Sequence, residues 1–239
     1  MVPEIIVDSS ENLAERLAAR VEAEGRSASG RRRRFALALP GGSVGEAFFP
    51  RLSRVALDWA AVEFFWTDER AVSPSDPASN YRLARSLWLD PANVPPERAH
   101  RMLGDAPDLG LAASAYADLL TTVLGHPPKL DLVLMGVGPD GHICSLFPGD
   151  PLLLEEGRWV GYVEAAPKPP PRRLTLTLPT LASAELIVLA AFGSAKARVV
   201  REALQEREGS SLPVSMLLRR ARRALVLLDP AAAGLLSTA

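Results

Sequence analysis

The loop Gly136–Gly149 holds the two side chains that are best suited to acid–base chemistry. His142 is one of three histidines in the chain, and imidazole titrates near neutral pH without help from its surroundings. Asp140 lies two residues earlier, where a carboxylate can orient the ring or stabilise its charged form. The loop therefore predicts a general base at His142 with Asp140 as its partner. A hydrogen-bonded structural histidine in a tight turn is the alternative.

The same loop matches the G-x-G-x-x-G pattern of dinucleotide-binding turns through Gly136–Gly141. Glu164 lies near the distance expected of an acid that binds the ribose. In a dinucleotide site, the third glycine opens a helix whose N-terminus holds the pyrophosphate. Pro148, Gly149 and Pro151 leave little room for such a helix. We therefore expect no nicotinamide cofactor. No His, Cys and Asp cluster with ligand spacing predicts a metal.

The composition limits the partners of the chain. A formal net charge of -1 argues against nucleic acid or an anionic membrane as the main partner, because both require a clear basic surplus. The one basic run, Arg31–Arg34, is expected to be a solvated loop before a strand. His100 and His126 lie in Pro-rich connections without polar neighbours, so we expect structural roles for both.

The sequence also bears on the cellular compartment of the protein. Cys144 is the only cysteine, so no internal disulfide can form, and we interpret it as a small apolar filler. The first residues lack the basic region and apolar core of a signal peptide. The longest apolar stretches, such as Leu186–Phe192, are far shorter than the roughly 20 residues of a membrane span. We therefore expect a cytoplasmic protein.

Short patterns typical of buried strands alternate with helical patterns, which favours a mostly parallel sheet covered on both faces. We predict an α/β fold: one domain over residues 1–239, with three α/β/α layers and a Rossmann-like sheet. The predicted strands are Glu4–Val7, Phe35–Leu39, Val62–Phe65, Leu130–Met135, Trp159–Val163, Arg173–Leu178, Leu186–Ala190 and Ala224–Leu228. The predicted helices are Glu11–Ala23, Ser79–Leu87, Ala112–Leu124, Ala195–Leu204 and Val214–Arg220.

Four polar or glycine-rich turns follow predicted strands. They are Pro40–Ser43, Thr67–Arg70, Gly136–Gly149 and Gly193–Lys196. Ligands of such sheets bind beyond the carboxyl ends of the strands. We therefore expect the four turns to form one site.

The segment Gly138–Gly149 resembles the signature of 6-phosphogluconolactonases, which share their fold with glucosamine-6-phosphate deaminases and isomerases. The lactonase branch ends this signature with Ser-Leu-Phe-Pro-Gly, as in Ser145–Gly149 here. The deaminase branch has Phe-Asn-Glu-Pro, whose glutamate belongs to the ring-opening machinery. The resemblance therefore implies a hydrolase and not an isomerase.

Other segments resemble the same family in order and spacing. Phe65–Val72 with Ser79–Tyr81 resembles its DER…SNY segment, and Ala166–Thr177 resembles its Lys-Pro-Pro…Arg-Leu-Thr stretch. Gly193–Ala197 resembles its Gly-x-x-Lys-Ala turn. The glycine loop departs from the family pattern, because Val44 stands where a hydroxyl side chain is usual.

The resemblance implies a role for each matched residue. His142, with Asp140 as orienter, is expected to activate water in the metal-independent hydrolysis of 6-phospho-D-glucono-1,5-lactone to 6-phosphogluconate, a step of the oxidative pentose phosphate pathway. The expected substrate- and phosphate-binding residues are Gly41, Gly42, Ser43, Asp68, Arg70, Lys168, Arg173 and Lys196. For Asp68, contact with sugar hydroxyls and holding Arg70 remain alternatives. Lysine occurs only at positions 129, 168 and 196, so two of the three lysines fall within matched motifs.

Two other functions are the alternatives. The first is a ketol isomerase or deaminase acting on an amino-sugar phosphate. The second is a sugar-phosphate sensor that binds without catalysis, which in related regulators carries a DNA-binding module. We expect a small-molecule sugar-phosphate lactone as the only partner, and a monomer, with a weak dimer as the alternative.

Overall fold

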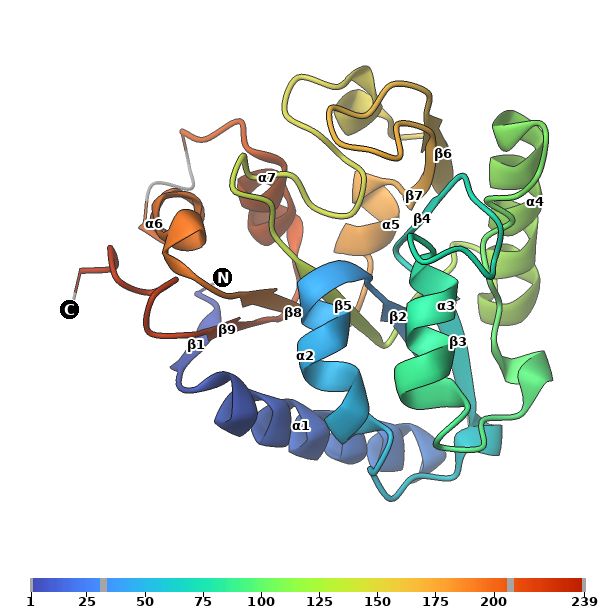
Figure 1. The fold of residues 1–239 in the computed structure, drawn as a ribbon, viewed down its shortest axis with the longest axis horizontal. Coiled ribbons are helices and arrows are strands. Elements are labelled where there is room, and N and C mark those ends of the chain that lie inside the picture. The colour runs from blue at the N-terminus through green and yellow to red at the C-terminus, as the bar shows by residue number, and fades with distance from the viewer. Residues whose placement is uncertain (1, 31–33, 206–208, 238–239) are drawn as a thin grey trace.

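The computed structural model describes residues 2–30, 34–205 and 209–237. Within these ranges the centre is a parallel six-stranded sheet in the order β1-β9-β8-β5-β2-β3. Its strands are β1 (Glu4–Val7), β2 (Phe35–Leu39), β3 (Val62–Trp66), β5 (Leu132–Gly136), β8 (Leu186–Ala191) and β9 (Ala224–Leu228). In Figure 1, α1 (Ser10–Gly30) and α2 (Gly42–Leu52) lie on one side of this sheet, and α5 (Leu178–Ala182) and α7 (Pro213–Arg220) lie on the other. The predicted α/β fold class is confirmed.

A second, antiparallel sheet stands beside the first (Figure 1). Its strands, in the order β4-β7-β6, are β4 (Asp68–Arg70), β7 (Arg173–Leu176) and β6 (Val160–Val163). Helix α4 (Leu109–Leu124) packs on β6 and β7. Two predicted strands therefore belong here and not to the parallel sheet, because a buried pattern indicates a strand but not its partner. Strand β4 was not predicted, since it is three charged residues long.

The remaining helices are short. They are α3 (Asn80–Ala84) with a π-helical turn at Arg85–Leu89, α6 (Ala197–Gln205), and 3₁₀ turns at Trp59–Ala61, Pro96–Arg98, Pro151–Leu154 and Ser194–Lys196. No helix of eight or more residues lies between β5 and β6 in the described chain. The prediction that Pro148, Gly149 and Pro151 leave little room for a crossover helix is therefore confirmed.

Helix α2 positions the glycine turn and was missed by the sequence analysis. It begins at Gly42, directly after β2, and contains Pro50 within its last turns. Glycine at the start and proline inside obscure a helical pattern. The buried residues Val44, Phe48 and Phe49 nevertheless pack α2 into the core. A Cβ at Gly136 would lie 3.0 Å from Cγ2 of Val44, so the glycine at the end of β5 lets the helix approach closely.

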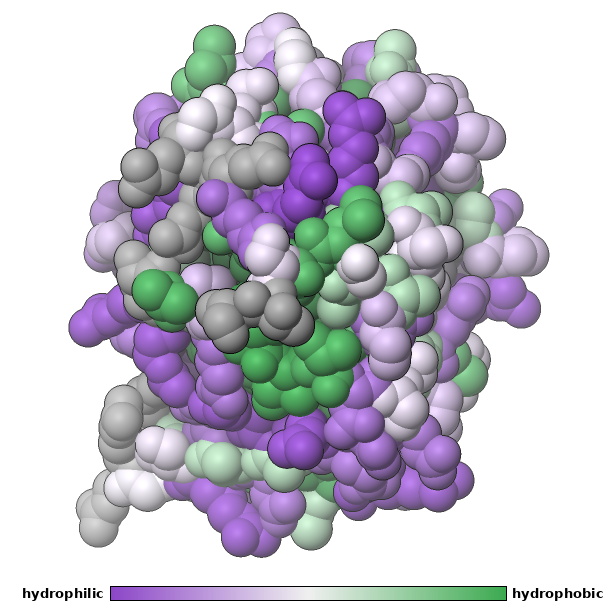
Figure 2. All heavy atoms as spheres, turned by 90° about the vertical axis from the view of Figure 1, so that its left-hand side faces the viewer, coloured by the Kyte–Doolittle hydropathy of each residue, from purple (hydrophilic) through white to green (hydrophobic). Residues whose placement is uncertain are grey.

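One apolar core includes residues of both sheets. The edge strand β1 pairs only with β9 and leaves Ile5 and Val7 partly exposed. On the face that carries α6, apolar and polar residues are interspersed around one apolar area (Figure 2). None of the described helices combines the length and the hydropathy that crossing a membrane requires. Of the predicted basic loop, residues 31–33 lie outside the described ranges, and Arg34 pairs with Glu63 at 2.6 Å.

Candidate active site

The four predicted turns meet at one cleft of about 210 Å³, at the carboxyl ends of the parallel strands. This volume is below the roughly 300–1,000 Å³ of pockets for drug-sized ligands. Nine of the ten predicted site residues line the cleft: Gly41, Gly42, Ser43, Asp68, Arg70, His142, Lys168, Arg173 and Lys196. The tenth, Asp140, does not line the cleft but is hydrogen-bonded to His142. A small, strongly polar ligand fits these walls.

A hydrogen bond joins His142 to Asp140, with Nδ1 and Oδ1 2.5 Å apart. The turn that places them is closed by the amide of Gly138, which donates to the His142 carbonyl at 2.8 Å. A Cβ at Gly138 would overlap both His142 Nδ1 and Asp140 Oδ1. Gly141, with φ of +85°, takes a left-handed conformation that favours glycine. With Nδ1 held by Asp140, Nε2 is the nitrogen that remains to accept a proton.

The surroundings of His142 keep its imidazole neutral. Burial lowers the pKa of His142, the Asp140 carboxylate opposes this shift, and the Lys168 charge adds to it. For Asp140, burial works against the charged form, but the hydrogen bond and charge of His142 hold its pKa below the usual value. The Phe147 ring packs 4.9 Å from the imidazole. The pair therefore combines an ionised carboxylate with a neutral base.

Asp68 is buried in the wall of the cleft, and three side chains outside the predicted site donate to its carboxylate, one of them the Thr67 hydroxyl at 3.5 Å. Ser145 Oγ donates to Oδ2 at 2.7 Å, and Asn80 Nδ2 donates to Oδ1 at 3.1 Å. The guanidinium of Arg70 instead donates to the carbonyl of Ala78 at 2.7 Å. Of the two alternatives for Asp68, a direct bond to Arg70 is therefore not what the described residues show.

Glu69 holds the Asp68–Arg70 strand against the start of α3. Its buried carboxylate accepts from the amides of Arg70, Asn80 and Tyr81 at 2.7 to 2.8 Å and from the Ser79 hydroxyl at 3.0 Å. Burial raises the pKa of Glu69 in spite of these four donors. Both segments belong to one family motif, but nothing in the sequence indicates that this acid joins them.

Arg173 is almost fully buried beneath the cleft. Its guanidinium donates to the carbonyls of Lys168 at 2.9 Å and Pro170 at 3.0 Å, and thereby holds the segment that carries Lys168. Burial lowers the pKa of Arg173, but a guanidinium stays protonated in proteins. Burial and the charge of Lys168 also lower the pKa of Lys196. The cleft thus holds several cations close enough to affect one another.

The turn Gly41–Ser43 forms the N-terminus of α2, where backbone amides lack partners inside the helix. Such amides, together with the helix dipole, favour an anion. Gly41 has no side chain that would collide with Asn80, whose Oδ1 occupies the space of a Cβ. Val44 is buried and offers no hydroxyl, so the donors that this turn can offer to an anion are its amides and the Ser43 hydroxyl.

The other residues that were singled out in the sequence have no role in the proposed acid–base chemistry. His100 Nε2 is 2.7 Å from Glu63 Oε2, and His126 packs on Trp159, so neither lines the cleft. Burial, followed by the charge of Asp68, raises the pKa of the Cys144 thiol well above its usual value. A protonated thiol is a poor nucleophile.

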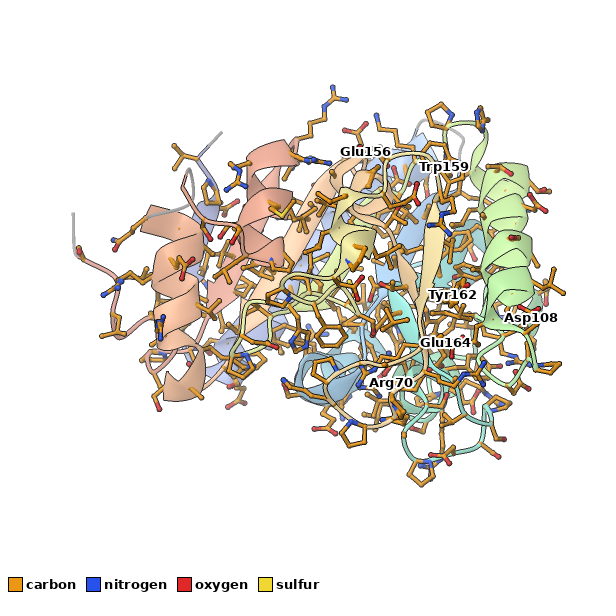
Figure 3. All side chains as sticks on the ribbon, turned by 90° about the horizontal axis from the view of Figure 1, so that it is seen from above. Arg70, Asp108, Glu156, Trp159, Tyr162 and Glu164 are labelled. Carbon is orange, nitrogen blue, oxygen red and sulfur yellow. The ribbon has the colours of Figure 1, made fainter. Side chains whose placement is uncertain are left out.

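The described part of the chain provides neither the ribose-binding acid nor the helix that a dinucleotide site would need. Glu164 follows β6 in the antiparallel sheet, on the same side of the molecule as Arg70 (Figure 3). Its Oε2 accepts from Arg172 Nε at 2.8 Å. The carboxylate that should bind a ribose is therefore engaged in a surface ion pair. In the described residues no group of three or more His, Cys, Asp or Glu side chains could hold a metal ion.

Comparison with known proteins identifies the family. Residues 8–227 match the family model described as glucosamine-6-phosphate isomerases/6-phosphogluconolactonase. The chain belongs to this family. A 6-phosphogluconolactonase of Streptomyces coelicolor is 38% identical over 245 residues, covering 97% of this chain and 94% of the relative. One of Mycobacterium tuberculosis is 38% identical over 206 residues, covering 82% and 83%. The resemblance stated from the motifs is thereby confirmed.

A solved structure shares the fold over nearly the full length of the chain. The 6-phosphogluconolactonase of Trypanosoma brucei superposes with a TM-score of 0.87 at 26% identity, covering 98% of this chain and 99% of that one. The sequence did not single out three residues of this chain: Asn80, which lines the cleft, and Glu69 and Ser145, which hydrogen-bond to residues that line it. Each lies inside a motif that was quoted, so the motifs contained the signal but not the contacts.

Proposed function

We propose that this chain hydrolyses 6-phospho-D-glucono-1,5-lactone to 6-phosphogluconate in the oxidative pentose phosphate pathway, with His142 as general base and without a metal ion. The observation that carries the proposal is the hydrogen bond between His142 and Asp140 at a cleft that is also lined by Arg70, Arg173, Lys168 and Lys196. The relatives named 6-phosphogluconolactonase support the same substrate.

A δ-lactone is an activated ester, so its opening needs a positioned water, a base and stabilisation of the carbonyl oxygen. Nε2 of His142 takes a proton from water while the hydroxide oxygen bonds to the lactone carbonyl carbon. Backbone amides of the glycine-rich turn donate to the resulting oxyanion. When the tetrahedral intermediate collapses, the ring C–O bond breaks and the imidazolium returns its proton to the leaving oxygen. The acid formed then releases a proton to solvent.

Asp140 stabilises the imidazolium that forms in this step and keeps Nδ1 protonated. The phosphate of the substrate is an anion that needs cations and backbone donors. Lys196, Arg70 and Arg173 supply charge from three different elements, and Lys168 lines the cleft from the segment that Arg173 holds. The phosphate therefore anchors the substrate while the base acts at its other end.

The direct assay follows proton release from freshly prepared 6-phosphogluconolactone. We expect the purified chain to accelerate release well above spontaneous hydrolysis, and to act poorly on unphosphorylated gluconolactone. A rate equal to the spontaneous one at micromolar chain would refute the function. Incubation with glucosamine 6-phosphate tests the deaminase alternative: no ammonia is expected, because Ser145–Gly149 contains no acid.

We further propose that the chain works in the cytoplasm as a monomer, without nucleic acid or membrane partners. The net charge of -1 supports the absence of polyanionic partners. Light scattering during size-exclusion chromatography measures the oligomeric state. We expect the mass of one chain, 25.6 kDa.

A further inference from the structure

Ser145 is a buried serine three residues after the proposed base in the sequence, and the proposed mechanism assigns it no task. Its side chain is fully buried. Its amide donates to Thr175 Oγ1 at 3.3 Å, and its hydroxyl donates to Asp68 Oδ2 at 2.7 Å. Thr175 and Asp68 are paired residues of β7 and β4. Ser145 therefore joins the loop of His142 to both of these strands of the second sheet.

The direction of the hydrogen bonds is fixed by what each partner can do. Arg173 has only donors, and its Nη1 lies 3.5 Å from Ser145 Oγ. The hydroxyl must therefore accept from the guanidinium and give its own proton to Asp68. Asn80 Nδ2 donates to the other carboxylate oxygen at 3.1 Å. Both oxygens of the Asp68 carboxylate therefore accept hydrogen bonds from fixed donors, which sets the orientation of the carboxylate.

The charge of Asp68 acts on its neighbours in the cleft. His142 faces Asp140, Lys168 and Asp68, and the two carboxylates both favour its charged form. Arg173 and the Cys144 thiol also face Asp68 and respond to its charge. A carboxylate fixed in this place can stabilise the imidazolium that hydrolysis produces. One that rotated towards Arg173 would do so less.

We infer that Ser145 is a positioning residue: its hydroxyl fixes the Asp68 carboxylate and links it to Arg173, so that Asp68 acts as a fixed negative charge beside His142 and carries no proton in the reaction. This inference rests on the proposed lactone hydrolysis. It makes Ser145 necessary for rate although it touches neither the base nor the scissile bond.

The test measures lactone hydrolysis by Ser145→Ala, Asp68→Asn and the double variant. Loss of a hydrogen bond to a charged group predicts that Ser145→Ala lowers kcat/KM by about 10–100-fold. Because Ser145 acts through Asp68, adding Ser145→Ala to Asp68→Asn should change kcat/KM by less than about twofold. Independent, multiplying losses would overturn the inference, because a merely structural serine would cost the same in either background.

Ser215→Ala is the matched control. Ser215 is also a fully buried serine, and its hydroxyl has no hydrogen-bond partner within the described residues. We expect wild-type kinetics from this variant. Ser145→Cys fills the same space with a weaker donor, so it should fall between wild type and Ser145→Ala, and it serves if the alanine variant does not fold. Wild-type kcat/KM in both Ser145 variants would overturn the inference.

The pH profile separates a fixed charge from a proton carrier. Asp68→Asn removes a negative charge that favours the imidazolium, so the acid limb of kcat/KM should persist with its midpoint at lower pH. Disappearance of that limb would identify Asp68 as the proton acceptor and overturn the inference. Absence of hydrolysis in wild type and Ser215→Ala would instead refute the proposed function, so the two failures are distinguishable.

Discussion

Among the individual residues of the cleft, Lys168 acts through its charge on both the proposed base and a second lysine. Its charge helps to lower the pKa of His142, which keeps the base neutral. It also lowers the pKa of Lys196, on the wall that we propose binds phosphate. Lys168 is held in place through its carbonyl by Arg173. A cationic cleft therefore serves both binding of the anion and readiness of the base.

The pH dependence follows from the lowered pKa of His142. Only the neutral imidazole accepts a proton, so kcat/KM should rise with pH through that pKa and then level off. Burial places the midpoint below the ordinary value of 6.5. Asp140 raises this pKa, so Asp140→Asn should move the midpoint lower still and reduce the plateau. Initial rates from pH 5 to 8 measure this, and a midpoint above 6.5 in wild type would contradict the electrostatics.

Lys196 is expected to contribute to binding of the phosphate group of the substrate. Lys196→Ala should raise KM for the phosphorylated lactone by about 10–100-fold, the cost of losing a charge-assisted hydrogen bond. The control is Lys129→Ala, because Lys129 pairs with Glu185 away from the cleft. Steady-state kinetics of both variants make the comparison. Equal KM values for the two variants would remove Lys196 from the phosphate site.

Site residues could be identified from the sequence where their partners are close along the chain. They could not be identified where their partners are distant along it. His142 and Asp140 are two positions apart, so their pairing is visible in the chain. Asp68 and Ser145 are separated by 77 positions, and Asp68 and Asn80 by 12. Nothing local in the sequence indicates which donors a buried carboxylate will meet once β4 and the loop are packed together.

At the scale of elements, the placement of the proposed catalytic pair depends most on the turn before His142. Gly138→Ala would place a Cβ onto both His142 and Asp140. Because small misplacements of catalytic groups can cost about 10²-fold in rate, we expect a loss of that order in kcat. Gly30→Ala is the control, since a Cβ there meets nothing within 4 Å. Circular dichroism should show both variants folded, and unchanged kcat for Gly138→Ala would contradict the geometry.

The elements were predictable where burial is periodic and local. Helix α1 repeats its buried residues Leu13, Leu17 and Val21 at helical spacing, and it was predicted, although it runs on to Gly30. Helix α2 was missed because glycine opens it and Pro50 interrupts its pattern. Strand β4 was missed because its three residues carry charges that only the buried site explains. The two elements that the local sequence pattern did not reveal, α2 and β4, therefore both border the cleft.

For the whole molecule, ligand binding should be visible as stability. A ligand at 100 times its Kd stabilises the folded state by about 2.7 kcal/mol, which for a chain of this size corresponds to a rise in Tm of about 5–10 °C. We expect such a rise with 6-phosphogluconate and none with gluconate at the same concentration. Thermal melts followed by circular dichroism measure it. An equal rise with gluconate would show that the cations do not select phosphate.

The central claim is that His142 activates water in a lactone hydrolase, and the rate of proton release from 6-phosphogluconolactone tests it most directly. The measurement compares wild type with His142→Ala and with His126→Ala, which removes an exposed histidine outside the cleft. General-base loss predicts a fall in kcat of about 10²–10⁴-fold for His142→Ala. His126→Ala should match wild type. Near-normal turnover by folded His142→Ala would contradict the account.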